Sequence, residues 1–182
     1  NAAIESIINQ SYKKFTLLII NDASTDNSFE IAKQYEEKDN RVTVFNLKEN
    51  KGPAFVRNFG IEQAKTELIA LMDADDIAEP DRFQKQIEVL QNNPEIGLCG
   101  TWFTLFGEKT NNQTIKHFEN HEQIKANFLI ECYIGNPTVM FKKSKLGNLR
   151  FKNEFVPMED YELWSRFILK TKFYNIPLSL LN

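Results

Sequence analysis

Apolar residues in the first half of the chain form short unbroken runs, and segments with helical periodicity separate these runs. Runs without polar–apolar alternation are typical of strands buried on both faces of a sheet. We predict strands at 15–20, 42–45, 68–72 and 96–101. We predict helices at 25–38, at 53–65 and from Pro80 onward. This alternation predicts an α/β fold with a mostly parallel central sheet flanked by helices.

The pattern is looser in the second half of the chain. We predict a helix at 121–133, a strand at 137–141 and a helix at 159–170. The polar segment 107–114 is expected to be a hairpin or loop, and residues 1–10 have the apolar spacing of the end of a helix. With 182 residues, 42% of them hydrophobic and 26% charged, the chain fits one globular domain.

The acidic segment Asp73-Ala74-Asp75-Asp76 directly follows the predicted strand 68–72. In open α/β sheets, ligands bind beyond the carboxyl ends of the strands. Neighbouring carboxylates repel one another unless a cation joins them, and Mg²⁺ and Mn²⁺ prefer oxygen ligands. The segment therefore predicts a metal site. The alternative is a solvated acidic turn that caps the next helix. If the metal site is present, Asp76 would lie behind the metal ligands or cap that helix.

A second polar turn, residues 21–27, follows the predicted strand 15–20. We expect Ser24 or Thr25 to cap the next helix. Asp22 would then lie beside a helix N-terminus at the same edge of the sheet. Its alternative role is to stabilise the turn with its own carboxylate.

Residues 49–60 form a third candidate segment. Pro53 suits the first turn of a helix, which places Arg57 one turn inside it. An arginine there can reach an anionic ligand near the helix N-terminus. The alternatives are a surface ion pair for Arg57 and an ordinary turn for residues 50–52.

Four segments, in this order, resemble motifs of family 2 glycosyltransferases. Residues 21–26 are similar to the family's D-D-G-S-x-D turn, and residues 73–76 to its D-A-D-D metal motif. Residues 50–60 resemble N-x-G followed by A-R-N-x-G, and residues 159–164 resemble E-D-Y-x-L-W. The resemblance covers nearly the whole chain. It implies the GT-A fold, which is the Rossmann-like fold of nucleotide-diphospho-sugar transferases.

The resemblance also implies roles for residues at the donor site. Asp75 is the expected direct ligand of Mn²⁺ or Mg²⁺, and Asp73 is expected to meet the ribose, the metal or a metal-bound water. Asp22 is expected to read the nucleotide base. The remaining residues expected to bind the nucleotide sugar are Asn50, Gly52, Arg57 and Ala74. A cation on the diphosphate would stabilise the negative charge of the leaving group.

The acceptor hydroxyl needs a general base, because an alcohol is a poor nucleophile until its proton is removed. Asp160, which matches the Asp of the family's E-D motif, is the expected base, and Glu159 is the nearby alternative. One base and direct attack opposite the leaving group imply inversion at the anomeric carbon. If neither residue is catalytic, both would merely cap the helix at 159–170.

By the same resemblance, residues 1–101 form the nucleotide-sugar and metal half of a single catalytic domain, and residues 102–182 the acceptor half. The expected donor is a UDP-sugar, and the expected acceptor is a glycan or lipid-linked hydroxyl in polysaccharide assembly on the cytoplasmic side of the membrane. Family members begin with an earlier strand and extend further, so we expect a chain truncated at both ends. Peripheral membrane attachment through missing segments stays open.

Composition adds few constraints. The formal net charge of −3 does not indicate the positively charged surface that binds nucleic acid. No signal peptide and no run of membrane-spanning length is visible in the sequence. Cys99 and Cys132 lie among apolar residues, which predicts inert, buried thiols in a reducing compartment. His117 and His121 have no metal-ligand spacing and are expected at the surface.

The main alternative function is a catalytically inactive nucleotide-sugar-binding domain of the same fold. A phosphotransferase or phosphatase with a nucleophilic Asp fits less well, because Asp76-Ile77 replaces the small turn residues that such sites use. An EF-hand calcium loop is excluded. Its sixth position would be Ala78 instead of Gly, and its twelfth would be Gln84 instead of Glu.

Overall fold

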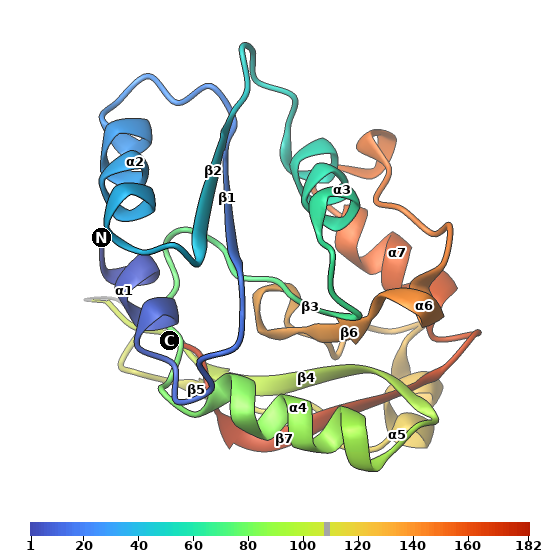
Figure 1. Cartoon of the computed structure of the whole chain (residues 1–182). Coiled ribbons are helices and arrows are strands. Elements are labelled where there is room, and N and C mark those ends of the chain that lie inside the picture. The colour runs from blue at the N-terminus through green and yellow to red at the C-terminus, as the bar shows by residue number, and fades with distance from the viewer. Residues whose placement is uncertain (108–109) are drawn as a thin grey trace.

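The computed structural model describes residues 1–107 and 110–182, and Figure 1 labels its elements. The α-helices are α1 (Ala2–Ile8), α2 (Ser28–Lys38), α3 (Pro53–Gln63), α4 (Arg82–Asn92), α5 (His121–Asn127), α6 (Lys143–Leu146) and α7 (Glu159–Phe167). The 3₁₀ turns are η1 (Asn136–Thr138) and η2 (Asn153–Phe155). The strands are β1 (Leu17–Asn21), β2 (Val42–Asn46), β3 (Leu68–Ala70), β4 (Ile96–Thr104), β5 (Thr114–Ile115), β6 (Met140–Lys142) and β7 (Lys172–Ser179).

The strands form two sheets, and the predicted α/β fold class is confirmed. β1 and β2 pair in parallel, while β3, β6, β4 and β5 follow one another in a second sheet in which β7 also pairs with β4. In Figure 1, β1 and β2 stand upright above the second sheet. β6 runs antiparallel to both β3 and β4, whereas β4 and β7 are parallel. The antiparallel insertion was not predicted, because β6 comes from the half of the chain without strand–helix alternation.

Several predicted boundaries are wrong. Helix α2 begins at Ser28 rather than at 25, because the carboxylate of Asp26 accepts the N–H of Ser28 at 3.0 Å, and neither Ser24 nor Thr25 caps the helix. The helix predicted at 121–133 ends at Asn127. The strand predicted at 137–141 begins only at Met140, because Pro137 lies in the turn η1.

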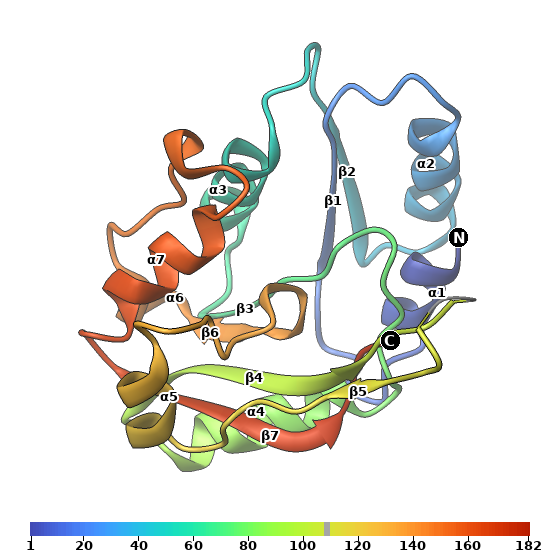
Figure 2. The same cartoon turned by 180° about the vertical axis from the view of Figure 1, so that it is seen from behind.

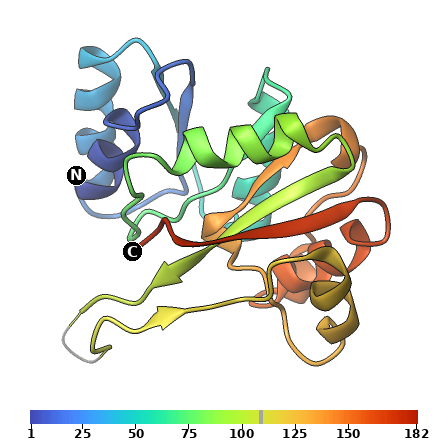
Figure 3. The ribbon, with the colours of Figure 1, turned by 90° about the horizontal axis from the view of Figure 1, so that it is seen from below.

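The remaining predicted elements keep their type, although their bounds differ, and β2 and β4 are longer than predicted. The strand at 68–72 ends at Ala70, and the helix at 159–170 ends at Phe167. β4 and β5, which flank the segment 107–114, pair antiparallel as a hairpin requires. They form the arm that extends from the sheet in Figure 3. Residues 108 and 109 of that segment lie outside the described residues.

Two apolar clusters cover the two faces of the second sheet. On β4, Leu98 belongs to one cluster and Cys99 to the other, as strand alternation requires. The first cluster joins the sheet to α3, α5 and α7, and its centre is the fully buried Trp164. The second joins the sheet to α1 and α4, and Figure 3 shows α4 and α7 on opposite sides of the sheet. Both clusters draw residues from both halves of the chain, so the site rests on a shared core.

The two cysteines are free and inert. Cys99 is buried and Cys132 is half-buried, and burial raises the pKa of each thiol to about 12. At neutral pH both therefore stay protonated. Across the part of the chain that the structure describes, none of the helices has the length and apolar character needed to cross a membrane.

Candidate active site

Arg57 joins three segments that are far apart in the sequence. One guanidinium nitrogen, Nη1, donates to Oε1 of Glu159 at 2.5 Å, and Nη2 donates to Oδ1 of Asp73 at 3.2 Å. The guanidinium also lies over the ring of Phe151, 5.7 Å from its centroid. Helices α3 and α7 accordingly lie side by side in Figures 1 and 2. The alternative considered for Arg57, a surface ion pair, is thus not observed as such: its ion pairs form a largely buried bridge between the acidic turn and the start of α7.

The acidic turn leaves the end of β3. The side chain of Asp73 is 44% exposed, and both Ala74 and Asp75 are exposed. Asp76 is half-buried, and its pKa is raised to about 6 by burial and by repulsion from Asp73 and Asp75. Asp76 does not cap the next helix, because Asp81 occupies the N-cap of α4. The turn thus exposes Asp73 and Asp75 and keeps Asp76 beneath them.

This turn fits a cation that is shared with a ligand. Within residues 1–107 and 110–182, no three His, Cys, Asp or Glu side chains converge as a metal site would require. The carboxylate of Asp75 makes no hydrogen bond to any described residue, so its hard oxygen atoms are available to a cation. Mg²⁺ is usually held by one or two carboxylates together with the phosphates of a substrate. The donor set therefore suits Mg²⁺ or Mn²⁺ on a diphosphate better than a metal bound by protein alone.

Asp22 organises the loop that precedes α3. Its two carboxylate oxygens accept the backbone N–H groups of Lys51 and Gly52, each at 2.8 Å. The amide of Asn50 donates to the carbonyl of Asp22 at 3.2 Å. Gly52 adopts φ 81°, which favours glycine, and Pro53 then opens α3. The turn-stabilising role considered for Asp22 is thus observed, and the loop that includes Asn50 and Gly52 is held against the end of β1.

Ala23 occupies a strained position beside Asp22. Its φ is 57°, in the left-handed region, at the place where the family motif has glycine. We expect Ala23→Gly to raise the free energy of unfolding by about 0.5 kcal/mol, since relief of strain exceeds the added chain flexibility. Urea denaturation would measure this change in the free energy of unfolding. Ala74→Gly is the control, because Ala74 lies in an exposed turn with ordinary φ and should gain nothing. Destabilisation by Ala23→Gly would refute this interpretation.

The first two residues of α7 have different surroundings. Glu159 is 5% exposed and holds Arg57, and its other carboxylate oxygen is buried with no hydrogen-bond partner among the described residues. Asp160 accepts the N–H of Tyr161 at 2.7 Å, and burial, together with the neighbouring Glu159, raises its pKa. Met158 is the N-cap and forms no side-chain cap. Glu159 therefore acts as an ion-pair partner, while Asp160 has the raised pKa that suits a proton acceptor.

Two contacts near the site were not predicted. Asn58 exchanges hydrogen bonds with the backbone of Phe151, at 2.8 and 2.9 Å, and so fixes the aromatic ring beneath Arg57. Asn58 lies in the R-N-x-G segment, and the sequence offered no other indication of its role.

The expected surface positions of the two histidines are wrong. His117 is half-buried between Phe103 and Tyr133, and His121 accepts the N–H of Phe173 at 3.2 Å.

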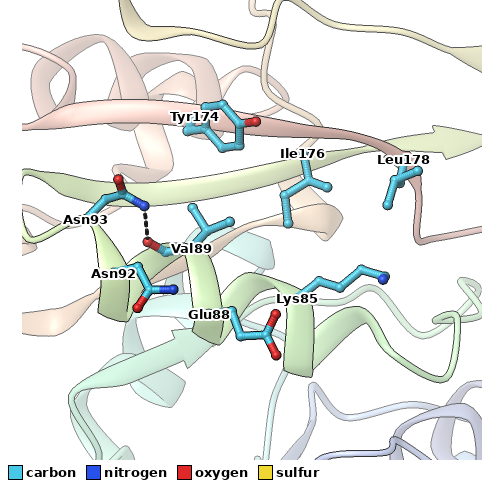
Figure 4. A pocket seen from close by; sticks show the side chains of 8 residues that line it. All are labelled: Lys85, Glu88, Val89, Asn92, Asn93, Tyr174, Ile176 and Leu178. Carbon is cyan, nitrogen blue, oxygen red and sulfur yellow. Dashed lines mark hydrogen bonds between the residues drawn. The ribbon is translucent and has the colours of Figure 1, made fainter.

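A shallow depression of 390 Å³ between α4 and β7 lies away from this site (Figure 4). It is lined by Lys85, Glu88, Val89, Asn92, Asn93, Tyr174, Ile176 and Leu178. None of these is a predicted site residue, and the open face offers no converging catalytic groups. Predicted site residues therefore lie at the Arg57 bridge and not in this depression.

The sequence model described as Glycosyl transferase family 2 matches residues 1–168. The chain belongs to glycosyltransferase family 2. Among curated relatives of this family, the O-antigen biosynthesis glycosyltransferase WbnJ of Escherichia coli is 37% identical over 172 residues, which cover 91% of this chain and 65% of WbnJ. The chain spans less than two thirds of the length of the relatives it matches first.

Two solved structures share the fold of this chain. S. aureus TarS 1–349, in complex with UDP, superposes with a TM-score of 0.83 at 18% identity, covering 99% of this chain and 54% of that TarS chain. A mannosyltransferase of Pyrobaculum calidifontis, in complex with GDP-Man and Mn²⁺, gives a TM-score of 0.70 at 16% identity. The superposition covers 96% of this chain and 49% of the mannosyltransferase chain. The predicted GT-A architecture is thereby confirmed.

Proposed function

We propose that this chain is the catalytic domain of a metal-assisted, inverting glycosyltransferase. It would transfer a sugar from a UDP-sugar to a hydroxyl of a glycan or lipid-linked glycan. The observation that carries the proposal is the Arg57 bridge, which joins the predicted donor motif at Asp73 to the predicted base motif at Glu159. This reaction needs a cation, a diphosphate and a base close together. The Arg57 bridge holds the segments that would bind them next to one another.

The donor would bind at the ends of β1 and β3. Asp22, with Asn50 and Gly52, would form the wall that meets the nucleotide base. Arg57 and Ala74 would face the diphosphate and sugar. The UDP complex of TarS and the O-antigen role in the name of WbnJ support a nucleotide-sugar donor and a glycan acceptor.

Asp75 and Asp73 would hold the divalent cation, Mn²⁺ or Mg²⁺. When bound, such a cation acts as a Lewis acid that stabilises negative charge on the leaving diphosphate. The exposed Asp75 and half-exposed Asp73 fit this role, and the Mn²⁺ complex of the mannosyltransferase supports it. Arg57 would add a second positive charge on the same side of the scissile bond.

Asp160 would act as the general base toward the acceptor hydroxyl. A carboxylate with a raised pKa removes a proton better than one with an ordinary pKa, and burial raises that of Asp160. Glu159 suits the role less, because its oxygen already accepts from Arg57. In the proposed arrangement, residues 1–101 bind the donor and residues 102–182 receive the acceptor.

Product analysis tests the proposal. The full-length protein would be incubated with Mn²⁺, a panel of UDP-sugars, and glycan and lipid-linked acceptors, and the anomeric configuration of the product would be read by NMR. We expect transfer with inversion and release of UDP. Retention of configuration would contradict the single-base mechanism. Tight nucleotide binding without transfer to any acceptor would favour an inactive binding domain.

A further inference from the structure

Arg82, the first residue of α4, is fully buried, with 0% of its surface exposed. Arginine is almost never fully buried unless it is paired, because moving a cation out of water is costly. The ion pairs among the described residues do not include Arg82. A buried, unpaired cation calls for a reason in the structure around it.

The guanidinium of Arg82 braces the start of the acidic turn. Nη2 donates to the carbonyl of Leu71 at 2.8 Å and lies 3.5 Å from the carbonyl of Val139. The same Val139 carbonyl accepts the N–H of Leu71 at 3.0 Å. Leu71 stands just before Met72 and Asp73, so Arg82 fixes the backbone from which the acidic turn departs.

Gln86, one helical turn further along α4, holds Arg82 in place. Its Oε1 accepts from Nε of Arg82 at 3.1 Å, and its Nε2 donates to the carbonyls of Cys99 and Thr138, each at 2.7 Å. Gln86 is also fully buried. The pair supplies side-chain donors to backbone carbonyls on three segments, at Leu71, at Cys99 and at Thr138–Val139.

The charge of Arg82 lies beneath the turn. In the part of the chain that the structure describes, Nη1 of Arg82 and Oδ2 of Asp76 are both buried without hydrogen-bond partners, and the two groups attract each other electrostatically. Asp73, Asp75 and Asp76 carry like charges within four residues. A fixed positive charge behind them offsets part of their repulsion in a low-dielectric interior.

We infer that Arg82 is a positioning residue, which holds the acidic turn so that Asp73 and Asp75 face the diphosphate and its cation. This inference rests on the proposed function. Arg82 touches neither donor nor acceptor in this arrangement, and it acts through the backbone of Leu71 and through its charge.

Calorimetric titration of UDP in the presence of Mn²⁺ tests this role with Arg82→Met, Arg82→Lys and the control Asn175→Leu. We expect Arg82→Met to weaken metal-dependent UDP binding about tenfold, and Arg82→Lys about threefold. Asn175→Leu should lower the melting temperature yet leave the affinity within about twofold, because Asn175 is also fully buried but donates to the carbonyls of Phe118 and Tyr133 and not to the acidic turn. The melting temperature of each variant separates loss of fold from loss of positioning.

The outcomes separate the inference from the proposed function. If the wild-type protein does not bind UDP with Mn²⁺, the proposed function itself is wrong. If wild-type and Arg82→Met bind equally, or if Asn175→Leu weakens binding as much, only the positioning role is refuted. Should Arg82→Met fail to fold, Arg82→Lys decides, and wild-type affinity in that variant overturns the inference.

Discussion

Asp160→Asn is expected to lower the rate constant for sugar transfer by about 10³-fold, within the range of general-base contributions. Asn keeps the size of Asp and can still accept the N–H of Tyr161, but it cannot take the proton of the acceptor hydroxyl. Binding of the nucleotide should be unchanged. Single-turnover transfer, with UDP affinity measured in parallel, is the test.

Glu154→Gln is the matched control, because Glu154 is an exposed carboxylate in the neighbouring turn η2. Glu154→Gln should transfer the sugar at the wild-type rate.

The pH dependence of the transfer rate gives a second test of Asp160. Burial raises the pKa of Asp160 above 3.8, so the base is lost as pH falls through that raised pKa, and the acidic limb should lie above pH 3.8. If Asp160→Asn transferred the sugar at the wild-type rate and Glu159→Gln were inactive, Glu159 and not Asp160 would be the general base.

Arg57→Met is expected to lower the free energy of unfolding by about 3 kcal/mol, because removal of one partner leaves the Glu159 carboxylate buried and unpaired. The double variant Arg57→Met/Glu159→Gln should recover much of this loss, since the uncompensated charge is gone. Urea denaturation of the two single variants and the double variant measures the coupling.

The control is Arg150→Met. Arg150 pairs with Glu62 at 3.8 Å, and their side chains are 32% and 61% exposed, so its removal should cost less than about 1 kcal/mol. An equally small cost for Arg57→Met would mean that the bridge does not hold α3 and α7 together. Loss of nucleotide binding in Arg57→Met alone would not separate the structural role from the donor role, which is why the double variant is needed.

Local sequence patterns predicted much of the site. The acidic turn, the 50–52 loop and the start of α7 each carry their signal within a few adjacent residues. The pattern also gave the α/β class, because unbroken apolar runs at β1, β3 and β4 need burial on both faces.

Features made by distant residues escaped prediction. Asn58 and Phe151 are 93 residues apart, and no local pattern joins them. β6 lies between β3 and β4 although it follows them in sequence, because pairing depends on tertiary packing. From the sequence alone, Arg82 would be placed on the solvent-facing side of an amphipathic helix. No residue near it in the sequence indicates that its guanidinium donates to the backbone carbonyl of Leu71.

The most direct test of the central claim is calorimetric titration of UDP, GDP and dTDP into the full-length protein, with and without Mn²⁺. We predict that one nucleotide binds only with the metal, that Asp75→Ala abolishes this binding, and that Asp160→Asn retains it. That result would place donor and base on separate sides of Arg57 in one site. Absence of metal-dependent binding in the wild-type protein, or its survival in Asp75→Ala, would contradict the account.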